Sequence, residues 1–176
     1  MTAPQIAGIN RRFGAYLLDG VFVGLIQAIA GGLILAPIAT YDPRIDGALA
    51  FVQQSAIGIA YFVITWTQNG ASPGQQLLGV RTLAYEDGSF LSQRQALTRW
   101  AFLYGPGALA PLVGAFTAGS TAGFFYIGLL VYLVVLYRTT LQDQVRRGLH
   151  DRWSGSVVMG PGYARGGTTA APENTP

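Results

Sequence analysis

The chain has 176 residues, of which 51% are hydrophobic and 11% are charged, whereas soluble domains are about 25% charged. The charges are bunched, because Gly20–Tyr41, Gly47–Val80 and Trp100–Tyr137 contain none. A soluble domain needs polar side chains at helical or strand spacing to face water. Composition therefore excludes an ordinary soluble fold and predicts an all-α membrane protein with the lipid bilayer as its main partner.

The absence of Cys and Lys and the presence of a single His argue against several further classes of protein and site. The chain contains no Cys, which excludes disulfides and thiolate sites, and all of its basic residues are Arg. Nucleic acid is not an expected partner, because Arg at the ends of membrane spans accounts for the net charge of +3. His150 is the single His, with no second ligand for a metal and no nucleophile motif for hydrolysis. We therefore expect neither an enzyme nor a bound cofactor.

The first predicted span covers residues 13–39, after a short head at residues 1–10. Arg11 and Arg12 precede this apolar run, which exceeds the roughly 20 residues that a span needs. A cleaved signal peptide is the alternative interpretation. It is less favoured because its apolar region is usually shorter and would not contain Asp19.

Three further spans are predicted. Residues 47–66 follow the polar turn Tyr41–Asp46 and end at Trp66, an interfacial type of residue. The uncharged segment Trp100–Tyr137 is too long for one helix across about 30 Å of hydrocarbon. A turn at residues 119–121 would divide it into spans at 100–118 and 122–137. Pro106 and Pro111 in the former predict a kink or a broken helix.

The segment between the second and third spans is the largest polar region. Residues 79–85 and 89–91 are predicted to form a small β-hairpin around the turn Glu86–Gly88. Ser92 and Gln95 have the spacing of a capping box, which predicts that a helix begins at Gln93. We expect that helix to lie at the cytoplasmic membrane surface.

The positions of Arg decide between three and four spans. Four spans place nearly every Arg on one side, and only Arg44 on the other. The positive-inside rule then predicts a multi-pass protein of the cell membrane with both termini in the cytoplasm. Residues 11–159 would form the membrane domain, and the Gly/Pro/Thr-rich residues 160–176 a disordered tail.

Asp19 is the most informative polar residue, because a carboxylate inside a span is costly unless it is paired or hydrated. Arg12 precedes it by two helical turns and shares its face. One interpretation is that Asp19 binds a cation or a proton. The alternative is that it pairs with an Arg such as Arg99, or that its carboxylate extends to the membrane interface. Gln27 and Gln53 could add polar contacts nearby. Small residues that allow close helix packing, within the chain or in a homo-oligomer, follow at Gly20, Gly24, Ala28 and Gly32.

Three motifs lie at separate places along the chain: Arg12–Asp19 (RFGAYLLD), Gly70–Arg81 (GASPGQQLLGVR) followed by Arg99, and Arg147–Asp151 (RGLHD). Together they resemble the motifs of the RDD family of bacterial membrane proteins, which is named for one Arg and two Asp. The resemblance covers about residues 9–159. It implies that the family's Arg is Arg12 and that its two Asp are Asp19 and Asp151.

The central motif places Gly70, Gly74, Gly79 and Arg81 in one loop. It departs from the family pattern at Gln75 and Gln76, because the family usually has Lys at the first of these positions. If that Lys contacts a phosphate or a carboxylate, this chain has lost the contact or moved it to Arg81.

Two functional hypotheses follow. In the first, the chain is a transport component for cations or protons, with Asp19 as the ligand and Arg12 adjusting its affinity. The resemblance supports this hypothesis, because some members of the family have been linked to cation/proton exchange. In the second, Arg12, Asp19, Arg99 and Asp151 form a charge network that holds the helices of a non-transporting scaffold or assembly factor.

Overall fold

The structure of the chain is a computed structural model that describes residues 6–117 and 120–161. It is mostly helical, with a two-stranded sheet. Three helices are long and apolar enough to cross a membrane: Ile9–Ile38, Pro43–Gln68 and Ala122–Gln142. Most of the predicted disordered tail, the first residues of the predicted head, and Gly119 of the predicted turn lie outside the described residues.

The first two predicted spans are confirmed as long helices. Helix α1 (Ile9–Ala30) continues through a π-helical turn, η1 (Gly31–Leu35), and a 3₁₀ turn, η2 (Ala36–Ile38). Helix α2 (Pro43–Gln68) begins inside the predicted polar turn. Its start is favoured because Asp42 Oδ1 accepts the Arg44 N–H at 2.9 Å and Pro43 occupies the first turn.

The third predicted span is broken, which is one of the two forms that Pro106 and Pro111 predicted, and is not one continuous helix over residues 100–118. The chain instead forms α4 (Gln93–Leu103), α5 (Gly105–Ala108) and α6 (Ala110–Phe116). The breaks fall just before Pro106 and Pro111, which lack the N–H that a continuous helix requires. The predicted helix start at Gln93 is confirmed, because Ser92 and Gln95 cap each other.

These short helices follow α2 along its length. α4 contacts one part of α2 and α6 another. A Cβ added at Gly47 of α2 would lie 2.4 Å from the Cβ of Ala115 in α6, so glycine permits this close approach. The last long helix, α7 (Ser120–Gln142), contains the predicted span at 122–137 and extends beyond it.

The predicted β-hairpin is wrong in its second strand. Strand β1 (Arg81–Ala84) pairs antiparallel with β2 (Ser156–Met159), in the register Arg81↔Met159. The predicted turn does form, because the Gly88 N–H donates to Ala84 O at 3.0 Å with a positive φ of 69°. The Ala84 N–H also donates to Ser89 O at 2.8 Å, but the chain does not continue as a strand after the turn, and Leu91 packs into the core with Phe62 and Trp66.

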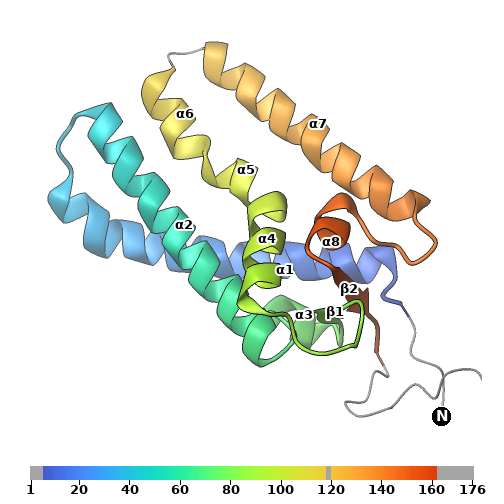
Figure 1. Cartoon of the computed structure of the whole chain (residues 1–176). Helices are drawn as coiled ribbons and strands as arrows, with labels where there is room; N and C mark the ends of the chain where they lie inside the picture. The colour runs from blue at the N-terminus through green and yellow to red at the C-terminus, as the bar shows by residue number, and fades with distance from the viewer. Residues whose placement is uncertain (1–5, 118–119, 162–176) are drawn as a thin grey trace, which may run out of the picture.

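One end of the molecule holds most of its buried residues. Figure 1 shows α3 (Pro73–Leu77), α8 (Leu149–Trp153) and both strands near the N-terminal end of α1. The Ala7 N–H donates to Val158 O at 3.0 Å, so the described N- and C-terminal segments lie side by side. Elsewhere large apolar side chains of α1, η1 and α7 are exposed, as expected for surfaces that face lipid: Leu25, Ile29, Leu33, Phe124 and Ile127.

Candidate functional site

Asp151 is the centre of a buried ionic cluster. It lies in the first turn of α8, where its Oδ2 accepts the Gly148 N–H at 3.0 Å. Arg99 donates to Oδ1 and Arg12 to Oδ2, the latter at 3.2 Å. The Asp151 side chain is inaccessible to solvent. Three of the four predicted site residues therefore meet here, and they come from α1, α4 and α8.

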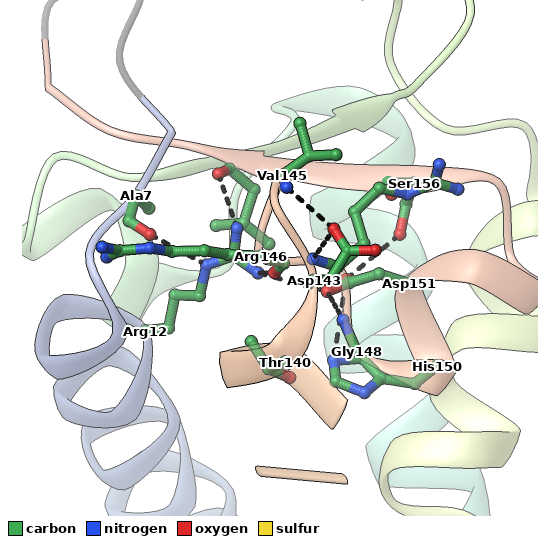
Figure 2. A network of polar contacts seen from close by, with 12 residues as sticks. Ala7, Arg12, Thr140, Asp143, Val145, Arg146, Gly148, His150, Asp151 and Ser156 are labelled. Carbon is green, nitrogen blue, oxygen red and sulfur yellow. Dashed lines mark hydrogen bonds and ion pairs between the residues drawn. The ribbon is translucent and has the colours of Figure 1, made fainter. Parts of the chain in front are cut away.

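Arg12 joins segments that are far apart in the sequence. Besides Asp151, its guanidinium donates to the carbonyl oxygens of Ala7 at 3.2 Å, Arg146 at 2.6 Å and Val158 at 3.1 Å. Figure 2 shows this side chain reaching from α1 toward Ala7 and Arg146. Because one side chain holds the N-terminal segment, the loop after α7 and β2, we infer a structural role for Arg12.

Arg99 supplies the second positive charge. It donates to Ser156 Oγ at 2.6 Å as well as to Asp151, and its guanidinium lies 5.2 Å from the centre of the Trp66 ring. Its Nε is buried without a hydrogen-bond partner in the described part of the chain. Two guanidinium groups therefore share one buried carboxylate, and the cluster retains a net positive charge.

The ionisation of this cluster follows from its surroundings. Burial by itself raises the pKa of Asp151, but Arg99 and Arg12 outweigh it and hold the pKa well below its usual value. The neighbouring His150 has its pKa lowered to about 4, mainly by burial; the charge of Asp151 opposes this shift, and the charges of Arg99 and Arg12 add to it. At neutral pH Asp151 is therefore an anion and His150 is uncharged.

Lowering the pH from 7 to 5 is expected to reduce the free energy of unfolding by about 2 kcal/mol through His150. Its folded pKa of about 4 lies below the usual 6.5, so in this range the unfolded state binds a proton that the folded state does not. Stability therefore rises with pH. Thermal unfolding in detergent at several pH values would measure this slope, which His150→Gln should remove. An equal slope in both proteins would contradict the assignment.

Asp19 does not join this ionic cluster. Its carboxylate accepts hydrogen bonds from Tyr61 Oη at 2.8 Å, Ser72 Oγ at 2.5 Å and the Gly74 N–H at 2.8 Å. The residue is only 2% exposed, and within the described part of the chain it makes no ion pair. The predicted pairing with an Arg such as Arg99 is therefore wrong, because neutral donors bind Asp19 instead, and its extension to the membrane interface stays a prediction.

The central loop motif builds this enclosure. Gly70 and Gly79 both have φ of 65°, a conformation that favours glycine. A Cβ at Gly74 would lie 2.7 Å from Ala15 O and 2.8 Å from Asp19 Oδ1, so glycine lets α3 approach α1. Arg81 is exposed and donates to Asn69 O at 3.4 Å. Within the described part of the chain Arg81 makes no ion pair, so it contacts neither Asp19 nor another carboxylate.

Gln75 is buried and has a structural function in the same loop. Its Oε1 accepts from Trp66 Nε1 and from the Ser72 N–H, both at 3.0 Å, and its Nε2 donates to Thr82 Oγ1 at 2.8 Å. A Lys has no acceptor for the first two donors.

Sequence reasoning missed Tyr61 and Ser72 as partners of Asp19. The Ser-Pro-Gly sequence could have indicated a helix start at α3, but not the carboxylate that this start faces.

Two cavities meet beside Asp19. The larger, about 740 Å³, extends along α1 and α2 toward Gln27, Gln53 and Gln54. The smaller, about 370 Å³, extends between α1 and α7 toward Arg12, Arg99 and His150. Both are lined by Tyr16, Asp19 and Tyr104. The predicted polar contact within the larger cavity is present, because Gln53 Nε2 donates to Gln27 O at 3.3 Å.

The predicted stripe of small residues has no close packing contact within the described part of the chain. A Cβ added at Gly20, Gly24 or Gly32 would meet nothing within 4 Å. Ala28 is likewise exposed. The involvement of this stripe in a homo-oligomer stays a prediction.

The long apolar helices and the ionic cluster at one end of them define a helical membrane protein. Comparison with protein-family models places the chain in the RDD family, whose model matches residues 6–155. The chain belongs to this family, as its motifs predicted. No match was found among curated proteins or among solved structures.

Proposed function

We propose that the chain is a component of a cation or proton exchange system in the cell membrane, with Asp19 as the ion-binding group. The observation that carries this proposal is a buried carboxylate at the junction of two cavities, with no counter-charge among residues 6–117 and 120–161. Ionisable groups inside membrane segments commonly mark ion pathways. The pair Arg12–Asp151 is separate from this site, so Arg12 does not tune Asp19 by direct contact.

The groups around Asp19 favour a proton as the ion. Two of its three donors are hydroxyl groups, those of Tyr61 and Ser72. A hydroxyl group can rotate to accept a hydrogen bond, whereas an N–H group cannot. Asp19 could therefore gain a proton and donate it to either oxygen with little movement. The described residues contain no cluster of three or more His, Cys, Asp or Glu side chains that could hold a metal ion.

The orientation in this proposal has four crossings, with α4, α5 and α6 together forming the third, and both termini in the cytoplasm. Residues 6 and 159 form an isolated β-bridge, which supports an even number of crossings. The distribution of Arg agrees with this orientation. Arg12 and Arg99 lie in the ionic cluster, at the end of the molecule where the described chain ends meet, whereas Arg44 lies 5.8 Å from the Phe116 ring at the end of α6. The positive-inside rule then assigns the Arg-rich end to the cytoplasm.

Asp19→Asn is expected to lower proton or sodium flux by about tenfold or more, because an amide cannot take up and release a proton in the working pH range. Flux would be measured in proteoliposomes with a pH-sensitive or sodium-sensitive dye. Asp87→Asn is the matched control, since Asp87 lies in an exposed turn where it accepts the Ser89 N–H. Equal flux in wild type and Asp19→Asn would remove Asp19 from the mechanism.

The second candidate is a non-transporting scaffold or assembly factor. The observation that favours it is the closed cluster of Arg12, Arg99 and Asp151, which fastens three helices and both described chain ends together. On this interpretation the wild type shows no flux above empty liposomes, and Asp19→Asn changes only stability. The flux experiment thus separates the two candidates.

A further inference from the structure

The groove between α1 and α7 has apolar walls. α7 contacts α6 and α8, and the smaller cavity, of about 370 Å³, lies between its C-terminal half and the start of α1. Phe13 of α1 is 55% exposed there, and Leu130 and Val134 of α7 are 62% and 51% exposed. In a bilayer this groove would open sideways to lipid. Its volume lies in the usual range for ligand sites, about 300–1,000 Å³.

The cytoplasmic end of the groove is positively charged. Arg12, Arg99 and His150 line it, and the one carboxylate of the cluster, Asp151, offsets only one of the two guanidinium charges. Arg99 Nε is buried with no hydrogen-bond partner in the described part of the chain. Guanidinium groups bind phosphate oxygens with favourable geometry. The groove thus combines an apolar wall with a site of excess positive charge at one end.

We infer that this groove binds one phospholipid, with its phosphate at Arg12 and Arg99 and an acyl chain along α1 and α7. The direction of the groove fits a lipid of the cytoplasmic leaflet. The groove runs along α7 from Thr140 and Tyr137, near the Arg-rich end, to Leu130, so a lipid with its phosphate at the Arg-rich end would direct its acyl chain into the bilayer. Charge complementarity favours an anionic headgroup such as phosphatidylglycerol, since basic pockets between membrane helices on this side bind anionic headgroups. The inference does not depend on transport by Asp19.

The test measures the thermal unfolding temperature in detergent with phosphatidylglycerol, phosphatidylcholine or inorganic phosphate added. Phosphatidylglycerol is expected to raise the Tm of wild type by about 5 °C or more, and the other two by much less. Val134→Trp fills the groove without touching the ionic cluster and should abolish this rise. Val135→Trp is the matched control, because Val135 points about 100° farther round α7 and lines neither cavity.

Two results would overturn the inference. If inorganic phosphate raises the Tm as much as the lipid does, the site binds a free anion. If Val134→Trp and Val135→Trp respond to the lipid equally, the groove is not the site. Native mass spectrometry of wild type in mixed phosphatidylglycerol and phosphatidylcholine gives a readout that needs no variant. One retained phosphatidylglycerol per chain is expected, and equal retention of both lipids would contradict the charge argument.

Discussion

Asp151→Asn is expected to lower the free energy of unfolding by about 3–5 kcal/mol, the largest effect of any single substitution considered. The change leaves the guanidinium groups of Arg12 and Arg99 buried without a counter-charge, because the side chains are only 10% and 4% exposed. The same amide would still accept the Gly148 N–H, so the helix start should persist. Thermal unfolding in detergent, followed by circular dichroism, would measure the loss.

Asp143→Asn is the matched control for this substitution. Asp143 pairs with Arg152 at 2.6 Å, but the Arg152 side chain is 51% exposed, and such pairs contribute only about 0–1 kcal/mol. An amide oxygen would also keep the hydrogen bonds from the Val145 and Arg147 N–H groups. Equal losses for Asp151→Asn and Asp143→Asn would show that the cluster does not hold the helices together.

Gly74→Ala is expected to cost about 3 kcal/mol, at the upper end of the range for overpacking. The new methyl group would lie 2.7 Å from Ala15 O and 2.8 Å from Asp19 Oδ1. Neither can move easily, because one belongs to the backbone of α1 and the other accepts the Tyr61 hydroxyl and the Gly74 N–H. Separation of α3 from α1 would weaken the enclosure of Asp19.

Gly24→Ala provides the comparison, because a Cβ at Gly24 meets nothing within 4 Å. Alanine in the interior of α1 should leave stability unchanged or raise it by up to about 1 kcal/mol. Both variants would be followed by thermal unfolding in detergent. A Gly74→Ala protein as stable as Gly24→Ala would contradict the close approach of α3 to α1.

The two parts of the predicted charge network have different physical roles in the structure. Arg12, Arg99 and Asp151 form a buried ionic cluster, which removes three charges from water and requires all of them to be present. Asp19 is held by hydroxyl and backbone donors instead. Disruption of the cluster should therefore affect stability, whereas under the proposed exchange function neutralisation of Asp19 should affect flux.

Local patterns in the sequence predicted several elements correctly. The apolar runs identified α1, α2 and α7 because a span is defined by length and composition, which can be counted along the chain. Ser92 and Gln95 identified the start of α4 because a capping box needs only residues three apart. Pro106 and Pro111 indicated the interruption of the third apolar segment, although not that it would form two separate short helices.

The sequence by itself determined a chain of the RDD family with long apolar helices and a gathering of Arg at one end of them. Only the tertiary structure decided which groups meet. Strand β1 pairs with β2, more than seventy residues later, and Asp19 faces Tyr61 and Ser72 rather than an Arg. Local periodicity carries no information on such pairings, because they depend on which helix ends pack together. The positively charged groove between α1 and α7 likewise depends on which helix ends pack together, so local periodicity does not predict it.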